Sequence, residues 1–543
     1  MNNKKITTAI IAIFAMFIST YSIAQKIEAQ SSKYVRNGMS VHFVTPSGFS
    51  SGIVNSIKVS GKYDDNSFGD NTLNVNLSSL ASDQNSKQKK GKANTSIEVE
   101  AGSDDYKSIE QAVQQQKIAN KILSNILLDE NGKINFDKTI FKRGEYNATD
   151  KDAIQADASN KGWGKIRTDA ITNVLNNVYL VVTQTGAITN ASSKDVTTYS
   201  VPFKSYLLQV DLASLLSTFE FYDKFPLDKN ITKELNDYKF SIKLLSVSNG
   251  IGSTTDQDIE LNGLKVVKKP KTEQQIYVDL ATSTVDQGLI DHANNYETLK
   301  VKTPVFSTGP ITAKIGKKEG LRIDDRFEVF ENRMSEKTGE KSATRMGYLR
   351  VGKVGDNESV ADGNSEVSKF YKAPARRVEK NMILKEIPET GIQVGAEIAF
   401  GESSYLATER YSFKIGNSTF YDERDVIKTK SVVMPLLNID YVTHLLKGNR
   451  VGLSLAVKDG NAIALAEVKQ VLQLNRLTFT PGVGYLYYLE SEGDEPGGLS
   501  ASFKMGLELG KNFQINLGPR FIADAVSGDI NAYFGLGIRV FGF

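Results

Sequence analysis

Cysteine is absent from all 543 residues. The absence excludes disulfides, and it excludes an N-terminal lipid of the bacterial lipoprotein type, because both modifications need a cysteine sulfur. Cysteine is also a usual ligand of structural zinc, and the three histidines, His42, His292 and His444, lie far apart in the sequence. We therefore expect no metal site, and we expect each histidine to be structural or exposed.

Long apolar runs are scarce as well. Lys4 and Lys5 precede an apolar run at 9–18, and the small residues Ser22 and Ala24 follow it, which is typical of a cleavable secretory signal. No later stretch reaches about 18 consecutive apolar residues, so a helical membrane protein is not expected. The sequence predicts an exported chain. If the mature chain is anchored in a membrane, the anchor is neither a lipid nor a transmembrane helix.

An excess of one charge sign is also missing. Lys plus Arg number 66 against 63 for Asp plus Glu, so nothing in the charge favours nucleic acid as a partner. No Walker loop, Gly-x-Ser-x-Gly motif or metal-spaced histidine pair is present. We interpret Gly250-Ile251-Gly252 as a loop and Asp324-Asp325 as a turn. We therefore expect no enzyme, no catalytic residue and no cofactor.

The first two thirds of the chain predict soluble structure. Alternation indicates strands at Ser40–Thr45 and Asn71–Leu77, and 82–96 has the composition of a linker. Periodic apolar residues predict helices at Tyr106–Leu128, Asp152–Asn176 and Thr272–Tyr296, a buried central strand at Val178–Thr183, and strands that could pair with it at Phe203–Leu212 and Tyr238–Ser246. This order of elements favours an α/β or α+β domain.

The predicted domains are a signal peptide (1–24), an N-terminal β segment with a linker (25–100), an α/β periplasmic domain (101–300), a small β domain (301–388) and a C-terminal β-barrel (389–543). The segment GKKEGLRIDDRFEVF at 316–330 resembles the opening of the small SH3-like barrels of other envelope proteins. We use this likeness for fold and not for function.

Four blocks in fixed order carry a further resemblance: RGEYNATD at 143–150, TDAITNVLNNVYLVV at 168–182, SYLLQVDL at 205–212, and the segment at 300–331 that contains the SH3-like opening. Together they resemble a family of exported Bacteroidota envelope proteins without an assigned biochemical activity, over about residues 106–387. The resemblance implies a secreted protein with an α/β part and a small β-barrel part. It supplies no catalytic residue.

The C-terminal segment alternates strictly between apolar and polar residues. In 499–509 one face carries Leu499, Ala501, Phe503, Met505, Leu507 and Leu509, and the other carries Ser500, Ser502, Lys504, Gly506 and Glu508. A membrane β-barrel needs this pattern, with an apolar face towards lipid and a polar face towards the lumen. A soluble antiparallel sheet packed on one side is the alternative.

Further strands are expected at 392–400, 405–415, 433–445, 451–458, 461–474, 477–489, 513–521 and 534–540. Eight or nine can be drawn, and the even number is preferred because bacterial barrels have even strand numbers. Two of them are weak: in Tyr405–Ile415 the charged Glu409 falls on the apolar face, and Asn461–Leu474 could equally be a helix. Phe541 is one step out of phase with the apolar Ile538 and Val540.

The lumen residues are predicted to be Lys504, Glu508, Arg520 and Arg539. Unpaired charges would be costly in so narrow a space, so we expect a salt-bridged plug in which an arginine pairs with a carboxylate such as Glu508.

The leading functional hypothesis is a non-enzymatic outer-membrane protein, whose barrel contacts membrane lipid and holds periplasmic domains that bind envelope partners. The alternative is a soluble periplasmic or surface binding module with a terminal β-sheet. A third hypothesis is an enzyme acting on envelope polymers in a cleft between domains. It would require a carboxylate pair or a Ser/Lys pair lining one pocket.

Overall fold

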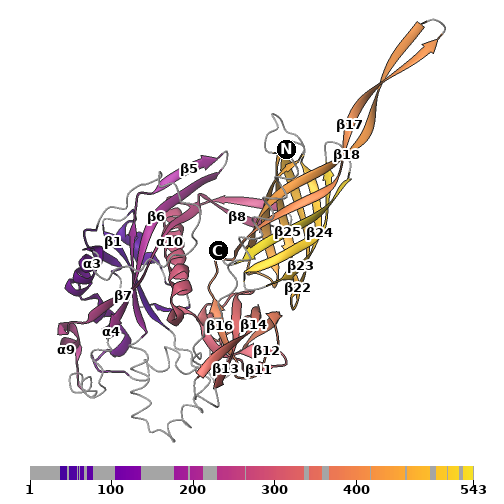
Figure 1. The fold of residues 1–543 in the computed structure, drawn as a ribbon. Helices are drawn as coiled ribbons and strands as arrows, with labels where there is room; N and C mark the ends of the chain where they lie inside the picture. The colour runs from indigo at the N-terminus through magenta and orange to yellow at the C-terminus, as the bar shows by residue number, and fades with distance from the viewer. Residues whose placement is uncertain are drawn as a thin grey trace.

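The computed structural model describes residues 37–45, 48–57, 59, 62–65, 70–77, 104–135, 177–193, 196–211, 229–262, 265–334, 341–357, 366–415, 418–458, 461–488, 497–509, 512–524 and 530–541. The predicted signal, the 82–96 linker, the 152–176 helix and the 143–150 block lie outside these residues. The described chain forms an α/β domain, a small β domain and a barrel (Figure 1).

The α/β domain is built on a seven-stranded sheet. Its centre is β4 (Val178–Thr185), which runs parallel to β1 (Gly38–Thr45) and antiparallel to β6 (Val196–Asp211). β7 (Ser241–Thr255) pairs with β6 rather than with β4. β7 is therefore an edge strand, and the short β2 (Asp64–Asp65), β3 (Thr72–Asn74) and β5 (Thr189–Ser193) also have one partner each. As predicted, 178–183 is a central strand buried on both faces.

The division at residue 100 needs correction. β1 and β3 belong to the same sheet as β4, so the predicted N-terminal segment 25–100 is part of the α/β domain. The physical reason lies in β1, where seven of eight residues are buried on the two faces of the strand. A strand of this kind needs a neighbour on each side and a layer above and below.

Helices cover both faces of this sheet. α3 (Asp104–Gln115) and α4 (Ile118–Leu127), with α9 (Thr232–Asp237) against α4, lie over one face, while α10 (Glu273–Asn295) and α2 (Ser51–Ser56) lie over the other. The single helix predicted at Tyr106–Leu128 is two helices, because Lys117 adopts φ 52° and breaks the run. α10 starts at a capping box formed by Thr272 and Gln275.

Gly250 and Gly252 lie within β7 and not in a loop. A Cβ on Gly250 would come 2.6 Å from the Phe203 ring, and one on Gly252 would collide with Thr284 of α10. The two glycines therefore let β7 approach its neighbours closely. The hairpin of β8 (Gln257–Asn262) and β9 (Lys265–Pro270) follows, and leads into α10.

The small β domain contains β10 (Lys302–Pro304), β11 (Ser307–Thr308), β12 (Ile311–Ala313), β13 (Arg326–Met334), β14 (Lys341–Lys353), β15 (Ser368–Ala375) and β16 (Ile383–Ile387). Their order in the sheet is β10-β16-β13-β14-β15-β12-β11. The core is apolar, and Phe327, Val329, Leu349 and Val351 are at most 1% exposed.

The C-terminal part is a closed antiparallel barrel of eight strands, as predicted. The strands are β17 (Ile392–Ile415), β18 (Ser418–Val442), β19 (Asn449–Lys458), β20 (Asn461–Gln470), β22 (Leu477–Tyr488), β23 (Gly498–Glu508), β24 (Phe513–Asp524) and β25 (Ile530–Phe541). The β17–β25 and β20–β22 pairings close the ring. The short β21 (Leu472–Leu474) continues the pairing of β20 with β22, so 461–474 is not a helix.

Two of the predicted strands, 392–400 and 405–415, are one strand, β17. It pairs with β18 in one unbroken register, and the distal halves of both strands extend beyond the barrel as a two-stranded ribbon (Figure 1). Glu409 therefore does not face lipid. It lies on this ribbon, where its carboxylate forms an ion pair of 2.5 Å with Lys428.

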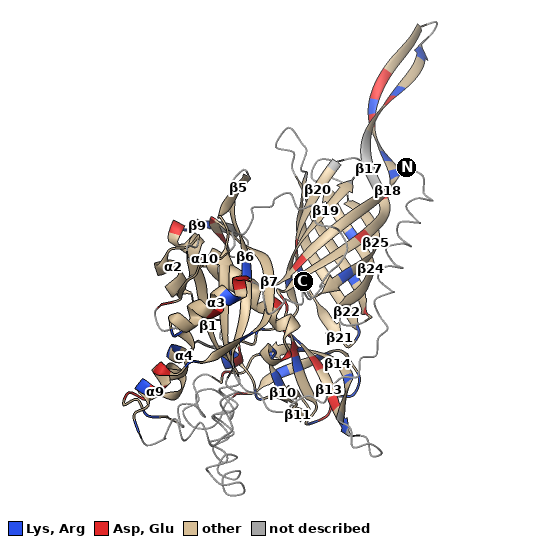
Figure 2. Ribbon diagram, turned by 60° about the vertical axis from the view of Figure 1, so that its left-hand side comes forward, with Lys and Arg blue, Asp and Glu red and all other residues tan. Residues whose placement is uncertain are grey.

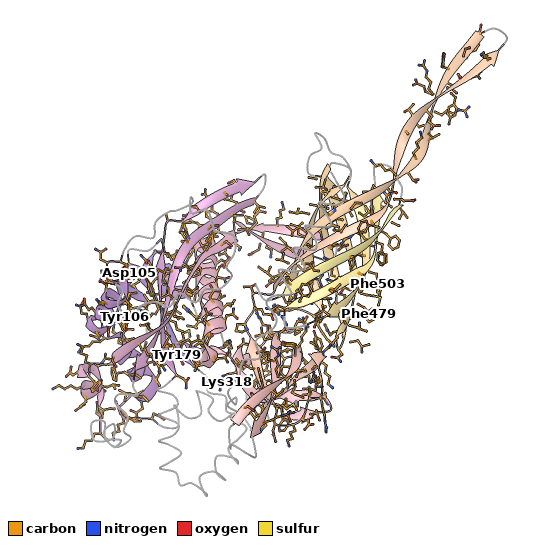
Figure 3. All side chains as sticks on the ribbon, viewed as in Figure 1. Asp105, Tyr106, Tyr179, Lys318, Phe479 and Phe503 are labelled. Carbon is orange, nitrogen blue, oxygen red and sulfur yellow. The ribbon has the colours of Figure 1, made fainter. Side chains whose placement is uncertain are left out.

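The barrel exterior is apolar. Along β23 every second residue is exposed, beginning with Leu499 at 66%, and the residues between them are buried. Phe479 and Phe503 lie side by side on the outer surface, with ring centroids 6.3 Å apart (Figure 3). Among the described residues, no helix is long and apolar enough to cross a membrane.

Candidate functional site in the barrel and at its covered end

Glu467 of β20 is the centre of the ion network inside the barrel. Arg520 of β24 donates to both of its carboxylate oxygens, at 2.6 and 3.3 Å, and the Lys469 ammonium lies 3.2 Å away. The Ser502 hydroxyl donates to it at 3.3 Å. Glu467 and Arg520 are each 1% exposed, so the two-pronged contact replaces the water that both charges have lost.

Two more carboxylates complete the network. Asp440 of β18 accepts a hydrogen bond from Lys469 at 2.7 Å, and its other carboxylate oxygen forms an ion pair of 2.7 Å with Arg539 of β25. Glu397 of β17 pairs with Lys504 of β23. The predicted lumen cations Lys504, Arg520 and Arg539 thus all lie inside the barrel beside an acid.

The three acids, Glu397, Asp440 and Glu467, were missed by the sequence reasoning. Each falls on the inward phase of its strand, which is the signal that could have found them. For Glu467 this signal was ambiguous, because the sequence allowed 461–474 to be a strand or a helix, and only a strand assigns the residue to the lumen.

The end of the lumen nearest the ribbon is apolar, whereas the sequence pattern predicted a polar face towards the lumen. Ten buried residues from seven strands form a cluster there: Ala399, Val432, Met434, Leu436, Ala456, Ile463, Leu465, Leu486, Ile522 and Tyr533. The cavity among the charged residues measures only about 20 Å³. That volume holds about one water molecule, so side chains fill this part of the lumen.

Glu508 differs from the other predicted lumen residues. It is 3% exposed and lies at the barrel end, where its Oε1 is 3.5 Å from Nη2 of Arg350 in β14 of the small β domain. Burial opposes the charge of Arg350, but Glu508, with Tyr371, Glu389 and Asp324 adding to its effect, holds the pKa of Arg350 above its usual value. We expected an arginine of the barrel as the partner of Glu508. Its partner is instead Arg350, which belongs to the small β domain.

Phe541 of β25 joins the same contact. Its ring is 1% exposed and lies under two guanidinium groups, with Arg326 at 5.2 Å and Arg350 at 5.7 Å from its centroid. Such cation–π contacts are strongest where water is excluded. The out-of-phase position of Phe541 in the sequence follows from this role, since the ring points inward to the small β domain.

Turns of the barrel complete the covered end. Asp324 accepts a hydrogen bond from the Gly448 amide at 2.5 Å, and the Ile323 carbonyl is hydrogen-bonded to the His444 ring at 2.6 Å. Asn475 accepts from the Ala375 amide at 3.1 Å. Asp324 and Asp325 do form a turn, as interpreted, and that turn is also part of the contact between the small β domain and the barrel.

A cavity of about 330 Å³ lies between the α/β domain, at α10 and at Lys62 and Tyr63, and the small β domain with the segment that leads from it to β17. Four acids line it: Asp286, Asp325, Glu386 and Glu389. Glu386 pairs with Lys62, and Glu389 pairs with Arg326 at 2.9 Å.

Two of these acids have perturbed pKa values. Asp325 accepts the Arg322 amide at 2.6 Å, and its burial raises its pKa to about 7. Burial also raises the pKa of Asp286. Three of the four acids thus have a close partner: Asp325 accepts a backbone hydrogen bond, and Glu386 and Glu389 each form an ion pair.

Two of the histidines are buried in the α/β domain. His292 is hydrogen-bonded to Ser205 at 3.0 Å and to Ser246 at 2.7 Å, and burial lowers its pKa to about 3. His42 is hydrogen-bonded to Ser40 at 2.9 Å, and burial lowers its pKa to about 4. Both are structural residues in the neutral form.

The buried histidines predict a loss of stability in acid. Below pH 6.5 the unfolded chain binds a proton at each histidine and the folded chain does not, so the free energy of unfolding should fall as the pH drops. For His292 the loss at pH 4 is about 3 kcal/mol. Urea denaturation of the full chain in micelles, followed by the helical circular dichroism signal, measures it. The signal reports the α/β domain, because all the described α-helices lie there.

The control for this experiment is His292→Gln, which should narrow the difference between the unfolding midpoints at pH 7 and pH 4. Equal pH dependence in the wild-type chain and the variant would contradict the assignment of the effect to His292.

Comparison with known proteins gives barrels. The N-terminal barrel domain of OprF from Pseudomonas aeruginosa is 12% identical, and the match covers 96% of it and 27% of this chain with a TM-score of 0.18. Neisserial surface protein A is 12% identical, with 97% and 28% covered and a TM-score of 0.19. A loop-deletion mutant of OmpT, an outer membrane protein of Vibrio cholerae, is 11% identical, with 97% and 40% covered and a TM-score of 0.14.

No protein-family model and no curated protein matches the chain. The assignment of the barrel therefore rests on its own geometry: eight strands close into a ring, the exterior is apolar, and the acids inside lie beside cations. Only a closed barrel satisfies every backbone group of a sheet within lipid. Residues 392–541 form a β-barrel of the outer-membrane type.

Proposed function

We propose that this protein is a non-enzymatic outer-membrane protein whose barrel anchors periplasmic domains that bind cell-envelope partners. The observation that carries the proposal is the contact of Arg350 with Glu508 and Phe541. It joins the small β domain to the barrel end through a buried ion pair and a buried ring. The domain is therefore held in a fixed position under the barrel.

The covered end is proposed to face the periplasm. The chain enters β17 from the small β domain and leaves β25 at Phe541, beside the same domain. The first and the last residue of the barrel segment therefore both lie at the covered end. Bacterial barrels turn tightly on the periplasmic side. The connection between β21 and β22 at the covered end has only two residues, Asn475 and Arg476.

A binding role fits a filled lumen better than transport does. The apolar cluster and the ion network occupy the interior, so the surfaces available to other molecules lie outside the lumen, and those of the soluble domains are among them. Crosslinking in cells, followed by identification of the attached proteins, tests whether those domains have envelope partners. Recovery of barrel-assembly factors alone would contradict a role in binding.

Fractionation tests the anchor. The protein should sediment with the outer membrane, and its unheated form should migrate faster on a denaturing gel than its boiled form, because a closed barrel resists detergent. Recovery of the mature protein in the soluble periplasm, with one mobility in both conditions, would instead support the soluble binding module.

The orientation predicts which residues a membrane-impermeant thiol reagent can reach. The chain has no cysteine, so single variants give an unambiguous signal. Ser412→Cys on the ribbon should be labelled in intact cells. Lys353→Cys, an exposed position of the small β domain, should be labelled only after the outer membrane is permeabilised. The reverse pattern would place the soluble domains outside the cell.

A further inference from the structure

The outer ribbon, defined as residues 402–415 of β17 and 418–431 of β18, leaves the barrel at the end opposite the small β domain (Figure 1). β25 pairs with β17 only up to Gly401, and β19 pairs with β18 only from Leu436. At about 3.3 Å per residue, each ribbon strand extends roughly 45 Å beyond the barrel wall. Within the described chain, nothing pairs with its two outer edges.

Such a ribbon is weakly stable by itself. An isolated two-stranded hairpin is marginal in water, and a free strand edge is a template for further pairing. Natural edges are often interrupted by proline or a bulge. The outer ribbon has no proline, and its register has no shift. Its edges are therefore regular enough to accept another strand.

Cross-strand pairs of the ribbon are complementary in charge. Glu409 is opposite Arg424, and Arg410 is opposite Glu423. Nearer the tip, Phe413 stacks on its partner Phe420 with ring centroids 5.6 Å apart. Each strand therefore carries the side chains that stabilise the other in this register.

Both charge signs are spread along the ribbon (Figure 2). Its acids are Glu402, Glu409, Asp422, Glu423 and Asp425, and its bases are Arg410, Lys414, Arg424, Lys428 and Lys430. The numbers are equal, so two ribbons carry no net repulsion.

We propose that the outer ribbon is a self-association surface, on which the β17 edge of one copy pairs with the β18 edge of a second copy. The proposal rests on the membrane placement given above. Barrels inserted in one membrane with one orientation hold their ribbons at equal height, with β17 running away from the membrane and β18 running towards it. The β17 edge of one copy and the β18 edge of the next are then antiparallel and at the same height above the membrane. Residues that are opposite each other within one ribbon, such as Glu409 and Arg424, are therefore also opposite each other between two ribbons.

This contact is head-to-tail, because β17 of each copy meets β18 of the next. It leaves one free edge at each end of a pair and can therefore extend into a row or close into a ring. The partner that fits the surface is a second copy of this chain.

Disulfide trapping between co-expressed single-cysteine chains tests the pairing. Ser412 is opposite Tyr421 in the ribbon register, and directly opposed residues have Cβ atoms about 5 Å apart, which a disulfide can bridge. Cells that make Ser412→Cys and Tyr421→Cys together should give a covalent dimer at least about tenfold above either variant alone. The matched control is Ser412→Cys with Thr429→Cys. Position 429 is opposite residue 404, so it lies roughly 26 Å along the ribbon from the position opposite Ser412, too far for a disulfide.

The outcomes separate clearly. A dimer in the 412/421 combination and not in the 412/429 combination supports the proposed register. A dimer with Ser412→Cys alone, or equal dimer in both combinations, overturns it, as does monomer in every combination when the barrel shows its heat-dependent mobility.

A second variant tests self-association through the outer ribbon separately from membrane anchoring by the barrel. Replacing 402–431 with a short turn should leave the heat-dependent mobility intact and abolish crosslinking of the membrane protein by a short amine-reactive reagent. Oligomers that persist without the ribbon would overturn the self-association surface and leave the outer-membrane anchor standing. Loss of heat-dependent mobility in the unaltered chain would contradict the anchor itself.

Discussion

Replacing Glu467 with leucine should lower the free energy of unfolding of the barrel by about 3 to 5 kcal/mol. The change leaves Arg520 without the carboxylate that accepts two of its hydrogen bonds, and it removes one of the two acids beside Lys469. Both cations remain buried in a lumen without room to hydrate them. Urea titration of the barrel in micelles, read from the fraction with heat-dependent mobility, measures the effect.

The matched control is Phe503→Leu on the lipid face, which should change the same free energy by about 1 kcal/mol or less. The change removes apolar surface from a residue that is 43% exposed. It leaves no buried polar group without its partner. Glu467→Gln should fall between the two, since the amide keeps an acceptor oxygen and loses the charge. Equal midpoints for Glu467→Leu and Phe503→Leu would mean that inside and outside are assigned wrongly.

Alternation predicted the barrel because it is a local property. In β23 the face of every residue follows from its position, and the structure shows the same two faces. The partners of the inward residues are not local. Lys469 meets Asp440 from a strand two places away, and Arg539 meets the same acid from the other side. Those contacts depend on the stagger of the closed barrel, which a strand-by-strand reading does not contain.

Distance along the chain also explains the error in the α/β domain. β1 and β4 are adjacent in the sheet, yet about 130 residues separate them. No turn signal announces a parallel pairing across such a gap, whereas hairpin partners are marked by the turn between them. The helix break at Lys117 was hidden for a related reason, because apolar spacing continued through a residue with a left-handed backbone.

The contact at the covered end was visible in the sequence only as an irregularity. Phe541 was out of phase with its strand, and Glu508 was expected to meet an arginine of the barrel. The phase of Phe541 and the unexpected partner of Glu508 have one cause, since both residues face Arg350 of another domain. Residues that break a pattern at the end of an element mark sites where something else packs on it.

Replacing Arg350 with leucine should release the small β domain from the barrel. The change leaves Glu508 buried without its cation and removes a guanidinium from the Phe541 ring, so the docked state should lose about 3 to 5 kcal/mol. Hydrogen exchange in the turn at 443–448 reports the docking, because its contacts with Ile323 and Asp324 are formed only when the domain is in place.

The double variant Arg350→Leu with Glu508→Leu decides whether the ion pair itself carries the effect. Two apolar side chains in place of a buried pair restore much of the lost stability, so exchange at 443–448 should be slower than in either single variant. Exchange that rises by the sum of the two single effects would show that the residues act independently. A domain held to its anchor by this pair keeps one orientation towards the membrane, and a surface with fixed orientation loses less conformational entropy when it binds a partner.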